Sequence, residues 1–212
     1  METILYIVRH GFSMSNAEKI FTGHTNVPLS ELGIKQASHV TEYFLDKQVD
    51  VIYSSDLDRA YNTVKGVADS KNLEIIKSQN LREIYAGEWE GKKFSEIMEK
   101  YPDYAMWRTT VHKVRTTGGE SVMELANRVY NEVLKIAKAE MGKTVLIGTH
   151  ATPLRSLIAK ICYGSFEKMD TTPWFPNCGI FKISFDGEKF TVLESCITEH
   201  LKEDISHLPP TV

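Results

Sequence analysis

The chain has 212 residues, 42% of them hydrophobic and 25% charged, which is ordinary for one soluble domain large enough to bury a core. The formal net charge of −3 gives no basic excess of the kind that general nucleic-acid binding requires. No apolar run is long enough for a signal peptide or a membrane span, and the three cysteines include no Cys-x-x-Cys pair. We therefore expect a cytoplasmic protein with no nucleic-acid or membrane partner, no disulfide framework and no metal site.

Strand-like and helix-like patterns alternate along the whole chain. Short apolar runs predict strands at residues 4–8, 49–53, 73–76, 144–148, 179–185 and 190–194. Helical spacing of apolar residues predicts helices at 31–44, 57–67, 94–100, 104–108, 121–141 and 154–161. This alternation predicts an α/β fold: a three-layer sandwich with a mostly parallel central sheet, helices on both faces, and an antiparallel hairpin at its end.

The same pattern suggests how the chain is organised. We expect a single domain over residues 1–198, in which residues 81–120 form a small cap insertion above the sheet. A tail over residues 199–212, which contains Pro209-Pro210, is expected to be poorly ordered. Trp107, Trp174 and Phe175 are interpreted as packing residues of the core or the cap.

Cations and imidazoles follow three of the predicted strands. Arg9 and His10 end the first strand, Arg59 lies just after the second, and His150 follows the strand at 144–148. Parallel strands bring their carboxyl ends to one edge of a sheet, where ligands bind. Two guanidinium groups and two imidazoles at one point match a phosphoryl group in charge and hydrogen-bonding geometry. The alternative for Arg59 alone is an ordinary surface ion pair with Asp56.

A longer set of motifs occurs in order over nearly the whole chain: Arg9-His10-Gly11, Ser15-Asn16, Phe21-Thr22-Gly23, Pro28 to Gly33, Ser54 to Leu57 with Arg59-Ala60, Leu81 to Ile84, Gly87 to Gly91, Gly118 to Ser121, and Thr149-His150. In this order and spacing the chain resembles the histidine phosphatase superfamily, the phosphoglycerate mutase-like family. The resemblance implies that His10 is the nucleophile and that Glu83 is the proton donor. It implies that Arg9, Arg59 and His150 hold the phosphoryl oxygens and that no cofactor or metal is needed.

The resemblance also implies contacts with the substrate or its phosphate by Asn16, Thr22 and Gly23, and a looser match at Asn177. The chain departs from the family pattern at two positions. Phe12 follows the Arg-His-Gly motif where a polar residue is usual, and Ala151 follows His150 where glycine is common. With Phe12 in this position, the chain lacks a polar side chain that could make a supporting contact beside the motif.

The function that follows is a metal-independent phosphomonoesterase that hydrolyses a small phosphorylated metabolite through a phosphohistidine. One alternative is a cofactor-dependent phosphoglycerate mutase. Mutases of the family carry a longer segment with adjacent arginines, whereas residues 101–117 are compact and hold the separated Arg108 and Arg115. A second alternative is a non-catalytic phosphate-binding relative, which the presence of His10 and Glu83 disfavours. The sequence leaves the natural substrate and the oligomeric state open.

Overall fold

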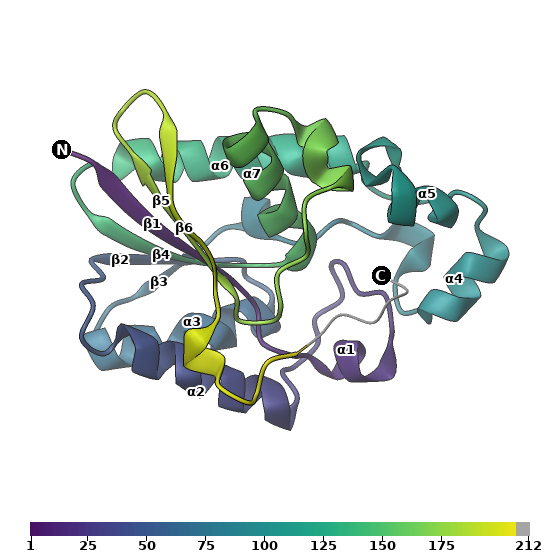
Figure 1. The fold of residues 1–212 in the computed structure, drawn as a ribbon. Helices are drawn as coiled ribbons and strands as arrows, with labels where there is room; N and C mark the ends of the chain where they lie inside the picture. Colours follow the sequence, from purple (N-terminus) through teal and green to yellow (C-terminus); the bar gives the residue numbers. More distant parts are fainter. Residues whose placement is uncertain (207–212) are drawn as a thin grey trace.

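The computed structural model describes residues 1–206. Six strands form one sheet in the order β3-β2-β4-β1-β5-β6 (Figure 1). The four strands β3 (Ile75–Lys77), β2 (Val51–Ser54), β4 (Thr144–Thr149) and β1 (Thr3–Arg9) run parallel. The last two strands, β5 (Ile180–Phe185) and β6 (Phe190–Ile197), are antiparallel to their neighbours. The predicted mostly parallel sheet with a final hairpin is confirmed.

Helices cover both faces of this sheet, as Figure 1 shows. On one face lie α2 (Glu31–Phe44) and α3 (Asp58–Lys71), and on the other α6 (Val122–Ala139) and α7 (Ala151–Tyr163). Side chains of β1 alternate between the two resulting cores: Leu5 and Ile7 pack with α6 and α7, whereas Tyr6 and Val8 pack with α2 and α3. The predicted three-layer α/β architecture is confirmed.

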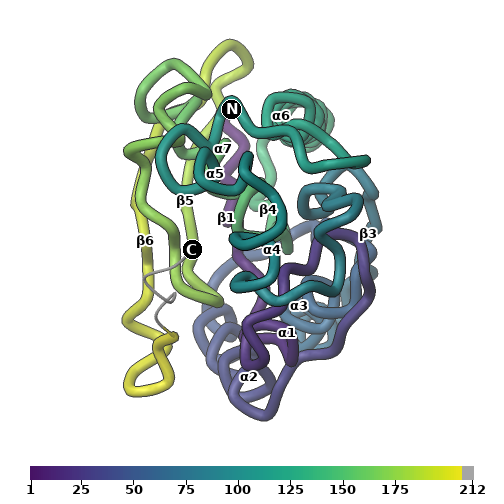
Figure 2. The backbone as a smooth tube through the Cα atoms, turned by 90° about the vertical axis from the view of Figure 1, so that its right-hand side faces the viewer, coloured from purple at the N-terminus to yellow at the C-terminus, as the bar shows by residue number. Residues whose placement is uncertain are grey.

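Three short helices lie beyond the carboxyl ends of the strands, in front of the sheet in Figure 2. They are α1 (Met14–Glu18), α4 (Phe94–Lys100) and α5 (Tyr104–Thr109). No helix is predicted from the sequence at α1. Its five residues form a helix because Ser13 and Asn16 make a reciprocal capping box at its start.

The segment after β6 differs from the expected disordered tail. Residues 199–201 form a single 3₁₀ turn in which Leu201 is fully buried against α2, and Ser206 is buried as well. The expectation of poor order is therefore wrong for residues 199–206, because their apolar and hydroxyl groups find partners in the fold. Residues 207–212, with Pro209 and Pro210, lie outside the described part of the chain.

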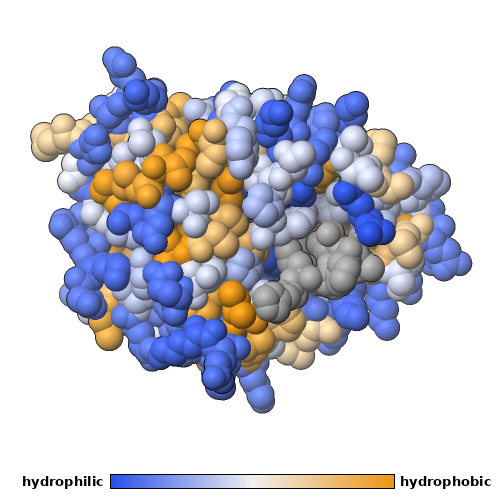
Figure 3. All heavy atoms as spheres, viewed as in Figure 1, coloured by the Kyte–Doolittle hydropathy of each residue, from blue (hydrophilic) through white to orange (hydrophobic). Residues whose placement is uncertain are grey.

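The face that carries β5 and β6 shows apolar residues among polar ones, gathered over these two strands (Figure 3). Val192 and Leu193 on the edge strand β6 are among the exposed large hydrophobic side chains. Among the described residues, no helix is both long enough and apolar enough to cross a bilayer.

Candidate active site

The register of the sheet brings two of the predicted site residues together. Arg9 on β1 is paired with Thr149 on β4, so the next residues, His10 and His150, lie side by side at the same edge. The His10 amide donates to the Thr149 carbonyl at 2.9 Å, and the two imidazole centroids are 5.2 Å apart. The convergence expected from parallel strands is therefore present for these two histidines.

The His10 ring is held in one tautomer. Its Nδ1 lies 2.7 Å from the main-chain oxygen of Gly11. A carbonyl oxygen only accepts, so Nδ1 carries the proton and the lone pair is left on Nε2. Burial, together with the positive charges of Arg59 and Arg9, holds the pKa of His10 well below its usual range. The imidazole is therefore neutral and nucleophilic at neutral pH.

The backbone at His10 is fixed by the loop that precedes β5. The side-chain amide of Asn177 donates to the His10 carbonyl at 2.9 Å, and the Cys178 amide donates to the Arg9 carbonyl at 3.0 Å. Ser206 closes this arrangement by donating to Asn177 Oδ1 at 2.9 Å. The loosely matched Asn177 thus holds the end of β1 in place, and a residue of the expected tail supports it.

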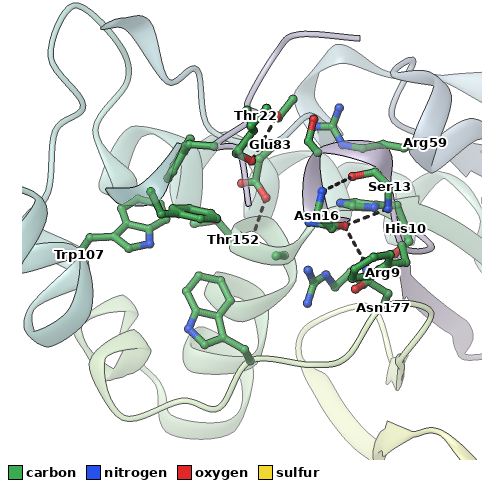
Figure 4. A pocket seen from close by; sticks show the side chains of 17 residues that line it. Arg9, His10, Ser13, Asn16, Thr22, Arg59, Glu83, Trp107, Thr152 and Asn177 are labelled. Carbon is green, nitrogen blue, oxygen red and sulfur yellow. Dashed lines mark hydrogen bonds between the residues drawn. The ribbon is translucent and has the colours of Figure 1, made fainter. Parts of the chain in front are cut away.

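Two buried guanidinium groups flank His10 in the pocket of Figure 4. Arg9 donates to the Phe175 carbonyl at 2.5 Å, and Arg59 donates to the carbonyls of Thr25 and Gly23 at 3.0 and 2.7 Å. Burial lowers the pKa of both arginines to about 10, so both remain positive at neutral pH. Both side chains line the pocket, so two positive charges lie at this end of it.

Asp56 is not the partner of Arg59. Arg82 takes that carboxylate in a two-point ion pair, with Nε and Nη2 donating to the two oxygens at 2.6 and 2.5 Å. The alternative of an ordinary Arg59 surface pair is therefore wrong, and Arg59 keeps its charge for the pocket. The pair also ties the loop after β2 to the loop that carries Glu83.

The position of His150 differs from that expected for a direct phosphate contact. Its side chain is fully buried, and Nε2 lies 2.8 Å from the hydroxyl of Ser55. It is absent from the residues that line the pocket. Burial and the charge of Arg59 hold its pKa well below its usual range, so the ring is neutral. In this state His150 lies behind His10, packed against it.

The carboxyl group of Glu83 lies across the pocket from His10 (Figure 4). Its Oε1 accepts from the Ile84 amide at 2.9 Å, and its Oε2 accepts from the Thr152 amide at 3.1 Å. Thr152 is in the first turn of α7, which directly follows His150. Helix α7 therefore fixes the distance between the β4 end of the site and the carboxyl group.

The three remaining predicted residues fall in different places. Asn16 and Thr22 line the pocket, where Asn16 Oδ1 accepts from the Ser13 amide and from Asn177. Gly23 does not line it: its amide donates to Glu90 at 3.1 Å and its carbonyl accepts from Arg59. A Cβ at Gly23 would stand 2.0 Å from the Ile84 carbonyl, so this glycine is required by packing rather than by ligand contact.

The wall of the pocket is aromatic, which the sequence analysis did not anticipate. Trp107 and Trp174 line it, and Phe12 lines it as well. The interpretation of the two tryptophans as packing residues is also confirmed, because Trp107 is buried in the larger core and Trp174 packs against that core. Phe175 agrees with its interpretation, because it is buried in the larger core. The departure from the family pattern at Phe12 thus adds an apolar surface to the site.

Comparison with known proteins agrees with this geometry. The family model of the histidine phosphatase superfamily (branch 1) matches residues 5–198. The chain belongs to the histidine phosphatase superfamily. Phosphoserine phosphatase 1 of Hydrogenobacter thermophilus is 34% identical over 203 residues, which cover 94% of each chain. The 2,3-bisphosphoglycerate-dependent phosphoglycerate mutase 2 of Gloeobacter violaceus is 32% identical over 176 residues, 79% of each chain.

A solved structure shares the whole fold. Bacillus stearothermophilus YhfR superposes with a TM-score of 0.90 at 28% sequence identity, covering 94% of this chain and 100% of that one. The predicted family is confirmed, and both phosphatases and mutases of the histidine phosphatase superfamily occur among the relatives.

Several supporting groups were missed by the sequence reasoning. The Thr152 amide holds Glu83, the Ser55 hydroxyl holds His150, and Arg128 on α6 donates to the main-chain oxygen of Glu83 at 2.7 Å. A backbone amide has no residue signature, and Arg128 lies 45 residues from Glu83 in sequence. The one available signal was Ser54-Ser55-Asp56, which marks a polar strand end without revealing which hydroxyl is used.

Proposed function

We propose that this member of the histidine phosphatase superfamily hydrolyses phosphomonoesters through a phosphohistidine on His10. The observation that carries the proposal is the hydrogen bond between His10 Nδ1 and the Gly11 carbonyl. It leaves the Nε2 lone pair free in a pocket where two guanidinium groups bind the phosphate and a carboxyl group lies opposite.

In the first step His10 Nε2 attacks phosphorus and the bond to the ester oxygen breaks. Arg9 and Arg59 hold the phosphoryl oxygens and offset the charge that develops on them. Glu83, in its acid form, gives its proton to the leaving oxygen, so that an alcohol departs instead of an alkoxide. The products of this step are the alcohol, phosphohistidine and the Glu83 carboxylate.

In the second step the Glu83 carboxylate takes a proton from water, and that water attacks phosphorus. The bond from phosphorus to Nε2 breaks, inorganic phosphate leaves, and both His10 and protonated Glu83 are restored. His150 supports this cycle from behind as a neutral ring that keeps His10 in place. Asn16 and Thr22 add polar groups around the phosphate.

Water is favoured over a sugar-acid hydroxyl as the acceptor. A mutase must hold the carboxylate of its phosphorylated acid while the phosphoryl group is on the histidine. Neither Arg108 nor Arg115 lines the pocket, and Arg115 is paired with Glu124 at the surface. Incubation with 3-phosphoglycerate distinguishes the two activities, because a phosphatase releases phosphate and a bisphosphate-primed mutase gives 2-phosphoglycerate.

Rapid quench tests the proposal directly. A 32P-labelled ester should label the enzyme in a bond that is labile to acid and stable to base, and EDTA should leave turnover unchanged. His10→Ala should abolish both labelling and turnover, and Tyr163→Ala, at an exposed aromatic far along α7, serves as the control. Turnover retained by His10→Ala, or a label stable to acid, contradicts the mechanism.

A further inference from the structure

The end of the pocket away from His10 has an apolar, rigid wall. Six side chains from four separate segments form it: Phe12, Ile20, Phe21, Phe94, Trp107 and Trp174. Trp107 and Trp174 are stacked, with centroids 6.4 Å apart and an interplanar angle of 26°. Figure 4 places Trp107 at the opposite end of the pocket from His10, with Glu83 between them. The leaving group of an ester bound at His10 therefore points toward these rings.

Four of these side chains, Phe21, Phe94, Trp107 and Trp174, belong to the larger hydrophobic core or pack against it, and they have little freedom to move. Phe21 contacts Trp107 edge-to-face at 5.2 Å and Phe94 at 5.7 Å, and Trp107 packs against the buried Trp89 at 6.0 Å. Interlocked aromatic rings of this kind keep one arrangement. The pocket is thus a preformed apolar surface, which favours a ring-bearing or otherwise apolar leaving group.

The lack of a lining cation at the aromatic end of the pocket disfavours a leaving group that carries a carboxylate. Among the described residues that line the pocket, the cations are Arg9 and Arg59, and both flank His10 at the phosphate end. Glu83, the proton donor of the proposed mechanism, stands between the phosphate end and the aromatic wall and supplies no positive charge there. A carboxylate on the leaving group would face aromatic rings, with no cation among the lining residues at that end to balance it.

An arginine behind the wall, Arg155, is already engaged. The Arg155 guanidinium lies 4.2 Å from the centre of the Trp174 ring, and its Nε donates to the Thr172 carbonyl at 2.7 Å. Trp174 separates this charge from the pocket, and Arg155 is not among the lining residues.

We propose that the substrate is a phosphomonoester of an uncharged aromatic or comparably apolar alcohol, and that esters whose alcohol carries a carboxylate are poor substrates. This inference rests on the proposed phosphatase function and adds the chemical class of the leaving group. The proposed specificity differs from that named for its relative phosphoserine phosphatase 1, because phosphoserine carries a carboxylate.

Esters with similar leaving-group basicity test the proposal, because differences between them then report binding instead of chemistry. We would measure kcat/KM for benzyl phosphate, 4-carboxybenzyl phosphate, glycerol phosphate and phosphoserine. Benzyl phosphate should exceed each of the other three by about tenfold or more, since a hydrophobic pocket discriminates by about 10- to 200-fold per small group. Equal or higher kcat/KM for phosphoserine overturns the inference.

Substitutions in the aromatic wall test whether its side chains cause the preference for benzyl phosphate. Trp174→Ala should lower kcat/KM for benzyl phosphate far more than for glycerol phosphate, mainly through KM, because the half-buried ring contributes contact area. Trp174→Lys should narrow or reverse the preference for benzyl over 4-carboxybenzyl phosphate by supplying a cation.

The exposed Tyr163→Ala is the matched aromatic control and should leave all ratios unchanged. Ratios that stay constant in both Trp174 variants overturn the inference. The two proposals fail differently. A phosphoenzyme on His10 with turnover that favours phosphoserine overturns this inference alone, whereas no turnover and no phosphoenzyme with any ester overturns the proposed function and this inference with it.

Discussion

Arg128 donates through Nη2 to the main-chain oxygen of Glu83 at 2.7 Å. The same guanidinium reaches the carbonyls of Arg82 and Asn80 at 2.8 and 3.0 Å, and Glu120 holds it with both carboxylate oxygens at 2.7 and 2.8 Å. One side chain on α6 thus binds three carbonyls of the loop that presents Glu83. All five contacts require the several coplanar N–H donors of a guanidinium group, so the position is specific for arginine.

The first prediction concerns this contact. Arg128→Lys keeps the charge and loses the coplanar donors, so the loop should shift and displace the Glu83 carboxyl group. We expect kcat for an alkyl phosphate to fall by about 10- to 100-fold, a part of the usual contribution of a general acid. The loss should be much smaller for p-nitrophenyl phosphate, whose leaving group needs no proton.

Arg115→Lys is the matched control, because Arg115 is an exposed arginine paired with Glu124 at the surface. It should leave both rates unchanged. If kcat falls equally for both esters in Arg128→Lys, Arg128 acts only on the stability of the fold. The melting temperature of the variant would then be lowered as well.

The second prediction concerns Glu83 itself. In Glu83→Gln one amide oxygen can still accept from the Ile84 or the Thr152 amide, so the side chain keeps its place but has no acidic proton. We expect kcat for alkyl esters to fall by about 10²- to 10⁴-fold. Plotted against leaving-group pKa, log kcat should show a steeper slope than in the unchanged protein. An unaltered slope would contradict the assignment of Glu83 as the proton donor.

The third prediction is a loss of stability in acid. His10 and His150 both have pKa values well below the ordinary 6.5, chiefly because they are buried. Above pH 6.5 these histidines are neutral in the folded and the unfolded chain, and their contribution to stability is complete. Below that pH the unfolded chain binds protons that the folded chain does not, so the free energy of unfolding falls until the lowered pKa values are reached.

Urea unfolding at pH 7, 6 and 5 measures this effect. Each of the two histidines should contribute a decrease that approaches about 1.4 kcal/mol per pH unit. His24 and His200, whose pKa values are also lowered, act in the same direction. His10→Ala should show a shallower decline than the unchanged protein, and an identical decline in the two proteins would contradict the prediction.

The fourth prediction concerns the segment that follows β6. Ser206 donates to Asn177 Oδ1 at 2.9 Å, and the amide of Asn177 donates back to the Ser206 hydroxyl at 3.2 Å. Ser206→Ala leaves a buried oxygen without a donor, at a cost of about 1–3 kcal/mol. Because Asn177 also holds the His10 carbonyl, we expect kcat to fall several-fold as well.

Denaturant unfolding and steady-state kinetics measure the two effects of Ser206→Ala. Ser38→Ala, at an exposed serine on α2, is the control and should change neither. If Ser206→Ala behaves like Ser38→Ala, the segment around Ser206 contributes nothing to the site.

Local patterns were sufficient for much of the fold. Ser121 and Glu124 form the expected capping box at the start of α6, and α4 spans the expected residues 94–100. These features depend on residues a few positions apart, so short-range rules describe them. The same rules miss α1, whose five residues rely on the reciprocal contact between Ser13 and Asn16 at its start.

For the candidate site, the sequence alone determined the chemistry. Arg9, His10 and Arg59 follow strands that had to be parallel, and the ordered motifs identified Glu83 as their carboxyl partner. Residue type and order are local properties, and the parallel sheet converts them into proximity at one edge.

Only the tertiary structure decided how each group is used. It places His150 behind His10 on Ser55, turns Gly23 toward Arg59, and brings Trp107 and Trp174 into the pocket wall. These outcomes depend on side-chain direction and on contacts between segments far apart in the chain, which periodicity does not encode. The class of reaction was therefore visible in the sequence, whereas the shape of the leaving-group site required the folded chain.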